Sequence, residues 1–151
     1  MKLHDYLTED TVLLDLKSRE KNELIAEIAM SLRPDPGVED YEEFLGSVFA
    51  REMGSTTGIG DGVAIPHART DSVRHFVAAM GVLPEGVDFT AVDGKPVRLV
   101  ILMGIPTPEV KAYLRLLAHL SLLLKQRDFM KRVLDARSPR EVLDVLVDYE
   151  A

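Results

Sequence analysis

Two uninterrupted apolar runs in the middle of the sequence constrain the fold more than any other feature. They cover Phe76–Leu83 and Val97–Met103, and Asp93-Gly94 predicts a turn between them. Each run has the length of a strand, and strands without alternating polar residues are typical of a sheet that is covered on both faces. We therefore expect a layered α/β domain in which a sheet carries helices.

Five segments around these strands have the apolar spacing or the end signals of helices. They are expected after Ser18 and before Pro34, from Asp40 to near Glu52, from about Glu109 to Lys125, over Asp128–Ala136, and from Ser138 onwards. The long third segment predicts one buried stripe, formed by Leu114, Leu117, Leu120, Leu123 and Leu124. The last segment begins with a serine cap, a proline and an acidic residue, which is a common helix start.

Length and composition agree with one domain over residues 1–151. Of the 151 residues, 46% are hydrophobic and 28% charged, as in ordinary globular proteins, and no linker or repeat divides the chain. The absence of cysteine excludes a disulfide scaffold, a thiol nucleophile and a cysteine-bound metal centre. It also fits a cytoplasmic location.

Charge and hydropathy argue against two classes of partner. Eighteen basic residues against 25 acidic ones give a net charge of −7, so we expect no nucleic-acid binding. The longest strongly apolar run, Leu99–Ile105, is far shorter than the ~20 residues that a membrane helix needs. Acidic residues follow Met1–Tyr6 and interrupt any signal-peptide pattern. We therefore expect no direct insertion into a membrane.

A glycine-rich loop is the one place where unusual backbone and reactive side chains coincide. Residues 54–62 read GSTTGIGDG, and the apolar segment Val63–Ile65 that follows predicts a strand ending at His67. The glycines alone are weak evidence, because they match neither the P-loop nor the dinucleotide-binding pattern. No histidine pair has the spacing of a zinc site, so we expect no metal. The loop and His67 form the candidate site.

The residues around His67 have the chemistry of a phosphoryl acceptor. An imidazole can attack phosphorus, and its reference pKa of about 6.5 leaves it neutral near pH 7. The hydroxyl groups of Thr56 and Thr57 and the guanidinium groups of Arg51 and Arg69 can stabilise the phosphoryl charge. From spacing alone, a structural histidine beside a tight turn is an equally good interpretation.

The sequence around this loop resembles a known family. Arg51-Glu52 is followed by GSTTGIGDGVAIPHAR from Gly54 to Arg69, which is similar to the signature of phosphotransferase-system (PTS) enzyme IIA domains of the fructose/mannitol and nitrogen-regulatory class, the type 2 EIIA domains. The similarity extends to VDFTAVDGKPVRLVILMGIP at 87–106 and YLRLLAHLSLLL at 113–124, and so covers essentially the whole chain. It implies a single α/β domain with a mixed parallel and antiparallel β-sheet flanked by helices on both faces.

The resemblance also implies a cytoplasmic phosphotransferase with a phosphohistidine intermediate and no organic cofactor. His67 would accept a phosphoryl group from the histidine-phosphocarrier protein and pass it to a IIB component or hold it as a signal, while Arg51 compensates its charge. The loop residues Thr56, Thr57 and Gly58 would shape the phosphoryl pocket. The alternative is a nitrogen-regulatory EIIA that binds a regulatory target according to its phosphorylation state, without transfer to a sugar.

One position departs from the family pattern. Many members have a second active-site histidine where this chain has Tyr113, directly before Leu114. A tyrosine hydroxyl can donate a hydrogen bond to a phosphoryl oxygen, but it has no positive charge near neutrality. His119 lies six residues further on, about 120° around a helix, and so cannot take its place. Two interpretations of Tyr113 stay open: a place in the phosphoryl pocket and a plain packing role.

Two expectations concern the surface. A shallow apolar area formed by Ile59, Val63 and Ile65 would let two protein partners dock in turn at the histidine. His4, near the terminus, and the acidic cluster Asp148–Glu150 are expected to lie in solvent.

Overall fold

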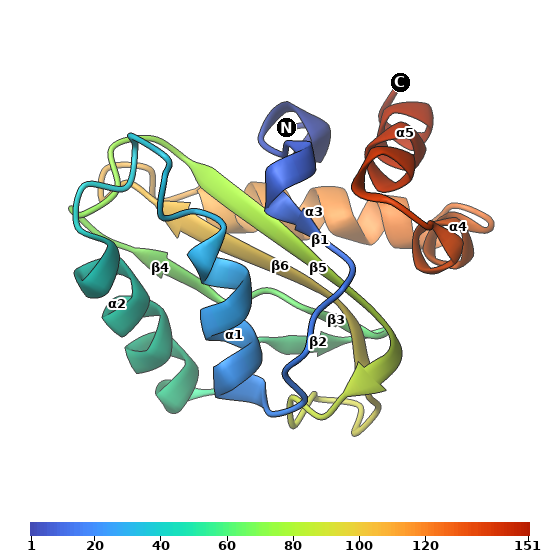
Figure 1. Ribbon diagram of the computed structural model, residues 1–151, viewed down its shortest axis with the longest axis horizontal. Helices are drawn as coiled ribbons and strands as arrows, with labels where there is room; N and C mark the ends of the chain where they lie inside the picture. The colour runs from blue at the N-terminus through green and yellow to red at the C-terminus, as the bar shows by residue number, and fades with distance from the viewer.

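The two apolar runs form the long central strands, β5 (Val77–Val87) and β6 (Val97–Ile105), of a six-stranded sheet in the computed structural model, which describes residues 1–151 (Figure 1). The shorter strands are β1 (Val12–Leu13), β2 (Gly58–Gly60), β3 (Val63–Ala64) and β4 (His67–Arg69). The helices are α1 (Lys21–Met30), α2 (Tyr41–Gly54), α3 (Ala112–Lys125), α4 (Phe129–Asp135) and α5 (Pro139–Glu150), and two 3-10 turns, η1 (Leu3–Asp5) and η2 (Glu9–Thr11), precede β1.

The sheet is mixed, as the family resemblance implied. Its order is β1-β5-β6-β3-β2, and β4 pairs with β6 beyond the end of β3. β5 and β6 are antiparallel, whereas β1 is parallel to β5 and both β3 and β4 are parallel to β6. β2 and β3 form a short antiparallel pair at the edge.

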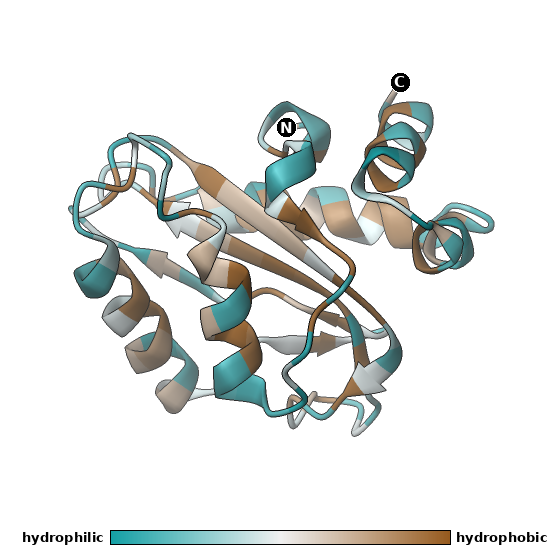
Figure 2. Cartoon of the chain, viewed as in Figure 1, coloured by the Kyte–Doolittle hydropathy of each residue, from teal (hydrophilic) through white to brown (hydrophobic).

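Each face of the sheet is covered by its own layer of helices. α1 and α2 lie on one face, and α3, α4 and α5 lie on the other (Figure 1). Successive residues of the central strands alternate between the two cores: Ala79 and Leu102 pack towards α1 and α2, whereas Met80 and Ile101 pack towards α3 and α5. Both strands are apolar along much of their length in Figure 2. The expected helix layers on both faces are confirmed.

The helix starts follow the capping signals of the sequence. Asp40 accepts a hydrogen bond from the backbone N–H of Glu43 at 3.1 Å at the start of α2, and Ser138 accepts one from Glu141 at 3.1 Å at the start of α5. α1 begins later than Ser18 because Glu20 provides the cap, accepting from Glu23 at 2.9 Å.

The segment around the glycine loop differs from the prediction. Part of the loop forms the edge strand β2, and Ile65 and Pro66 divide the predicted strand into β3 and β4. Both pieces pair with β6, because the carbonyl of Pro66 still accepts from the N–H of Met103 at 3.0 Å. His67 therefore begins a strand instead of ending one.

The predicted stripe of α3 is partly wrong. The buried positions are Ala112, Leu116, Leu120 and Leu123, whereas Leu114 is 60% exposed. Leucines occur on several sides of this helix, so the apolar spacing fits more than one stripe, and only packing against the sheet selects among them. None of the five helices combines the length and hydropathy needed to cross a bilayer.

Candidate functional site

His67 is held at the start of β4 with its imidazole fixed in one tautomer. Its Nδ1 lies 2.8 Å from the carbonyl oxygen of Ile65, and the residue is only 9% exposed. A carbonyl oxygen can only accept a hydrogen bond, so Nδ1 carries the proton. In the neutral ring the lone pair is therefore on Nε2, which is the nitrogen that can act as a nucleophile.

Tyr113, in the first turn of α3, covers the ring of His67. The two ring centroids are 4.5 Å apart and the planes are inclined by 27°, which is a stacked arrangement. The structure therefore brings this position, where the family pattern has a second histidine, directly to the imidazole of His67. His119 is turned away and contacts Glu150, as the helical geometry predicted.

The two predicted arginines have different surroundings. Arg51, in the last turn of α2, donates from Nη1 to the carbonyl and hydroxyl oxygens of Ser55, at 2.9 and 3.2 Å. Arg69 is exposed and donates to the carbonyl of Thr107 at 2.7 Å, which ties β4 to the loop after β6.

Burial and charge together set the protonation state of His67. Burial lowers the pKa of the imidazole below its ordinary value, and the positive charge of Arg51 lowers it further. The hydrogen bond to Ile65 and the negative charge of Glu52 act in the opposite direction but do not reverse the shift. The imidazole is neutral at pH 7, as nucleophilic attack requires.

The threonines of the loop use their hydroxyl groups within the protein. Thr56 donates from Oγ1 to the carbonyl of Phe89 at 2.6 Å and accepts from the N–H of Gly58 at 3.0 Å. Thr57 is 2% exposed and donates its hydroxyl to Glu52 at 2.6 Å. At Gly58 a Cβ atom would lie 2.9 Å from the Cα of Ala91, so only glycine fits this close approach. These contacts fix the shape of the loop beside His67.

Glu52 and Lys21 are the residues that the sequence analysis missed. The buried Glu52 accepts from both the N–H and the hydroxyl of Thr57, and its Oε2 lies 2.7 Å from Nζ of Lys21. The sequence contains one signal for Glu52: it follows Phe44 and Val48 at a spacing of four residues, on the side of α2 that is buried. A glutamate on an apolar stripe indicates a carboxylate with partners inside the protein.

The expected apolar docking area is wrong in part. Val63 and Ile65 are completely buried in the core, because β3 lies inside the sheet, and Ile59 is half-buried. Three other apolar residues are exposed next to site residues in the sequence or in space: Met53 (87%) follows Glu52, Leu114 (60%) follows Tyr113, and Val92 (76%) lies against Gly60.

A second buried carboxylate lies away from His67. Glu150 accepts from the backbone N–H groups of Leu3 and His4, from Nδ1 of His4 at 2.7 Å and from Nε2 of His119 at 2.5 Å. The expectation that His4 and Glu150 lie in solvent is wrong, because this cluster closes the end of α5 against η1 and α3. These N–H donors outweigh the effect of burial and keep the pKa of Glu150 below its ordinary value.

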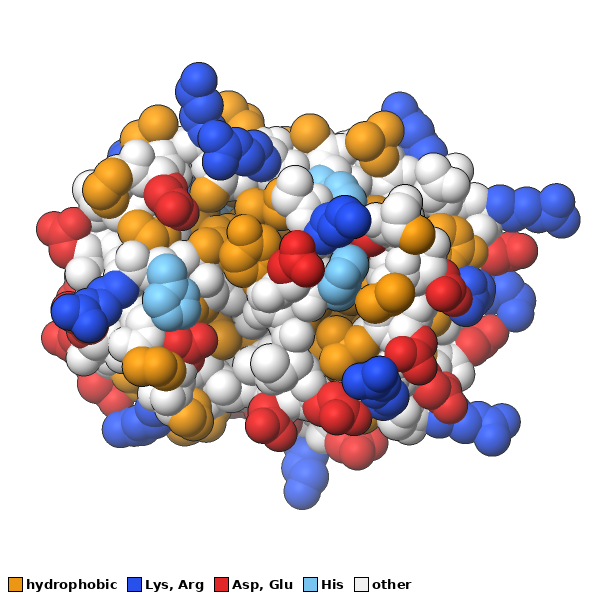
Figure 3. Space-filling model, turned by 90° about the horizontal axis from the view of Figure 1, so that it is seen from above, with side chains coloured by type: hydrophobic (Ala, Val, Ile, Leu, Met, Phe, Trp, Pro, Cys, Tyr) orange, Lys and Arg blue, Asp and Glu red, His pale blue; other side chains and the backbone are white.

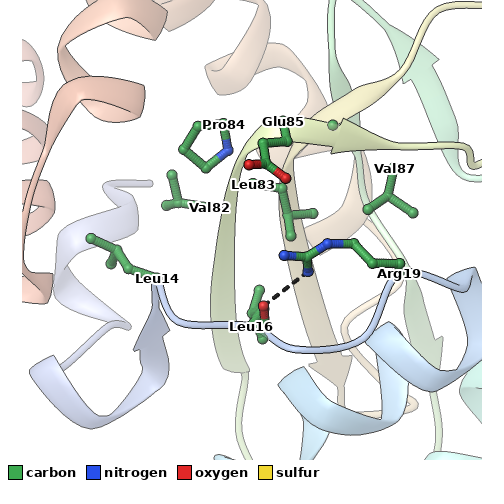
Figure 4. Close-up of a pocket in the computed structure, with 9 residues that line it drawn as sticks. Leu14, Leu16, Arg19, Val82, Leu83, Pro84, Glu85 and Val87 are labelled. Atoms are coloured by element: carbon green, nitrogen blue, oxygen red, sulfur yellow. Dashed lines mark hydrogen bonds between the residues drawn. The ribbon is translucent and has the colours of Figure 1, made fainter.

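Other surface features do not extend the site. The cavity in Figure 4 lies between the segment after β1 and the second half of β5, and shares no residue with the site; Arg19 in its wall donates to the carbonyl of Leu16. No group of three or more histidine, aspartate or glutamate side chains is arranged to hold a metal ion. On the face seen in Figure 3, acidic and basic side chains are interspersed.

The sequence and the fold both match known proteins. The family described as phosphoenolpyruvate-dependent sugar phosphotransferase system, EIIA 2, matches residues 5–149. The chain belongs to this EIIA type 2 family.

Similar EIIA proteins come from two branches of the family. The chain is 33% identical over 150 residues, 99% of its length, to the PTS system fructose-specific EIIABC component of Bacillus subtilis, but it spans only 24% of that longer protein. It is 37% identical over 123 residues to the PTS system fructose-specific EIIA component of Haloferax volcanii, covering 81% of this chain and 80% of that protein. The crystal structure of nitrogen regulatory protein IIA-Ntr from Neisseria meningitidis superposes with a TM-score of 0.85 at 29% identity, over 95% of this chain and 98% of that one. The family and the fold expected from the sequence are therefore confirmed.

Proposed function

We propose that this EIIA domain is a phosphoryl carrier that accepts its phosphoryl group on Nε2 of His67. The observation that carries the proposal is the hydrogen bond to Ile65, which fixes the proton on Nδ1 and leaves the lone pair of the neutral ring on Nε2. A lowered pKa keeps the ring neutral at pH 7, and Arg51 supplies the nearby positive charge.

The proposed donor is the phosphohistidine of the histidine-phosphocarrier protein. The Nε2 lone pair of His67 forms the new P–N bond while the P–N bond of the donor breaks, and its electron pair returns to the donor imidazole. Nε2 has no proton to lose, and Nδ1–H remains on the carbonyl of Ile65, where it stabilises the charge gained by the ring. Arg51 offsets the phosphoryl charge.

The remaining candidate residues support this reaction without touching the nucleophilic nitrogen. Thr56, Thr57 and Gly58 shape the phosphoryl pocket through the fixed conformation of their loop, because their hydroxyl groups are already bonded within the protein. The ring of Tyr113 shields one side of the imidazole from water. Arg69 holds the strand that carries His67.

Protein partners would approach over exposed apolar residues in the segments that carry the site. Met53, Val92 and Leu114 are all more than half exposed; Met53 and Leu114 adjoin Glu52 and Tyr113 in the sequence, and Val92 lies against Gly60. Small apolar contacts of this kind suit transient complexes, in which a donor and an acceptor bind the same surface in turn. We propose a cytoplasmic location, in keeping with these partners.

The phosphoryl group has two candidate destinies: transfer to a IIB component, or retention on His67 as a signal for a regulatory target protein. The identity with fructose-specific EIIA proteins favours transfer to a IIB component. The match to IIA-Ntr over nearly the full length of both chains favours the second candidate, in which a regulatory target protein binds according to the phosphorylation state of His67. Phosphorylation changes the charge beside Arg51, and a target could recognise that change.

The test is intact-mass measurement after incubation with phosphoenolpyruvate, the general PTS enzyme I and the histidine-phosphocarrier protein. The wild-type chain should gain one acid-labile phosphoryl group, His67→Ala none, and the matched control His75→Ala, at an exposed histidine, the same as wild type. Labelling of His67→Ala would disprove the site. Addition of purified IIB components then distinguishes the destinations: loss of the label to IIB indicates a sugar relay, and binding of a target without transfer indicates regulation.

A further inference from the structure

An ion pair between a buried carboxylate and a partly buried ammonium group supports the glycine loop, away from the groups that contact the imidazole. Nζ of Lys21, the first residue of α1, is 2.7 Å from Oε2 of Glu52, and the two side chains are 21% and 3% exposed. A buried carboxylate requires a partner and hydrogen bonds. Glu52 has both, since its two oxygens also accept from the N–H and the hydroxyl of Thr57 at 3.0 and 2.6 Å.

Hydrogen bonds continue from this pair to the reactive imidazole. The carbonyl of Thr57 accepts from the N–H of Ile65 at 3.0 Å, and the carbonyl of Ile65 accepts from Nδ1 of His67 at 2.8 Å. The series therefore runs from the ammonium group to the carboxylate, through the backbones of Thr57 and Ile65, to the imidazole. The N–H and the carbonyl of each of these residues are joined through its Cα atom, so a displacement of Glu52 moves Thr57 and, through Ile65, the acceptor of the imidazole proton.

The charges that face the imidazole give the ion pair a second effect. Arg51 and Glu52 from α2 act on the ring, and the uncharged phenol of Tyr113 covers it from α3. Lys21 does not contact the ring, but it offsets the negative charge of Glu52, which would otherwise favour the protonated imidazole.

We propose that Lys21 is a positioning residue for His67: through Glu52 and Thr57 it holds the carbonyl of Ile65 that fixes the imidazole tautomer, and it neutralises the carboxylate beside the ring. The relevance to phosphoryl transfer rests on the proposed function of His67. The tautomer and the protonation of the ring do not depend on that function, and both can be measured directly.

The experiment is a pH titration of the imidazole nitrogens of His67 by ¹H–¹⁵N NMR, in wild type, Lys21→Met, Glu52→Gln and the double variant. Lys21→Met leaves Glu52 unpaired, so the pKa of His67 should rise by about half to one unit, whereas Glu52→Gln should lower it. The double variant should return close to wild type. In Lys21→Met the neutral ring should also lose its exclusive Nδ1–H tautomer.

Controls separate this effect from general damage to the fold. Lys21→Arg should retain the wild-type pKa, as should Lys125→Met, an exposed lysine at the far end of α3. If Lys21→Met does not fold, Lys21→Gln removes the same charge and should raise the pKa in the same direction. pKa shifts of His67 with opposite signs in Lys21→Met and Glu52→Gln support the proposal, because a general loosening of the fold would shift the pKa in the same direction in both variants. An unchanged pKa, or shifts of the same sign, would overturn it.

Failure of the inference and failure of the proposed function give different results. If wild type is not labelled from phosphoenolpyruvate but the NMR shifts follow the predicted signs, the carrier function fails and the positioning role stands. If wild type is labelled and Lys21→Met matches it in pKa, in tautomer and in labelling rate across pH, the positioning role fails alone. If both are correct, Lys21→Met should be labelled more slowly than wild type at pH values below its raised His67 pKa, and at the wild-type rate at pH values above it.

Discussion

Replacing Glu150 with glutamine tests how strongly the second buried carboxylate stabilises the fold. Its two oxygens accept four N–H groups, from the backbone of Leu3 and His4 and from the rings of His4 and His119, at 2.5–3.0 Å. In Glu150→Gln one oxygen becomes an NH₂ group that faces donors, so some of these contacts change from attractive to repulsive.

The expected loss follows from the number and kind of these bonds. Hydrogen bonds to a charged group contribute about 1.5–3 kcal/mol each, and a buried donor left without a partner costs about 1–3 kcal/mol. A change of histidine tautomer recovers part of the loss, so we expect Glu150→Gln to lower the free energy of unfolding by about 2–4 kcal/mol. For a domain of this length, each kcal/mol corresponds to about 2–4 °C in Tm.

The assay is urea unfolding at several pH values, with Asp148→Asn as the control. Asp148 lies on the same helix, and its pair with Arg132 is exposed, so its loss should cost less than about 1 kcal/mol. The folded-state pKa of Glu150 is lowered, so its contribution is complete above the ordinary value of 4.5 and is lost as the pH falls through the lowered value. Glu150→Gln should remove this part of the acid dependence. A variant within about 0.5 kcal/mol of wild type, with an unchanged acid limb, would refute the reasoning.

Three further predictions concern the site and the core. Because burial and Arg51 lower the pKa of His67, the labelling rate should fall with decreasing pH with a midpoint below the ordinary imidazole pKa of 6.5, which a pH series of initial rates measures. Tyr113→Phe keeps the stacked ring and should be labelled like wild type. Tyr113→Ala should be labelled more slowly at pH 6, because water then reaches the imidazole and favours its protonated form, which cannot attack phosphorus. Slow labelling of Tyr113→Phe would show that the hydroxyl acts on the phosphoryl group. Gly104→Ala would place Cβ 2.9 Å from Cε1 of Phe44 and should destabilise by about 1–3 kcal/mol in urea unfolding, while Gly46→Ala, in open space on α2, should stabilise by roughly 0.5–1 kcal/mol.

Local patterns in the sequence predicted the parts of the fold that depend on neighbouring residues. The apolar runs gave β5 and β6, and the caps at Asp40 and Ser138 gave the starts of α2 and α5. The division of β3 from β4 at Pro66 was missed because it depends on pairing with β6, which is distant in the sequence. The stripe of α3 was misplaced for the same reason, since the sheet selects the buried side.

The candidate site shows the same limit. His67 and its neighbouring loop could be selected as the candidate site from residues close together in the chain, and the resemblance to the family favoured a functional role for His67 over a structural one. The partners of Glu52 and Glu150 could not be found in this way, because Lys21 lies 31 residues from Glu52 and His4 lies 146 from Glu150. Only the folded chain brings these groups together.

The most direct test of the central claim is a ¹⁵N and ³¹P NMR measurement on the phosphorylated chain. The account predicts that phosphorus is coupled to Nε2 of His67 and that Nδ1 keeps its proton on the carbonyl of Ile65. Phosphorus on Nδ1 of His67, or on another of the four histidines, would contradict it.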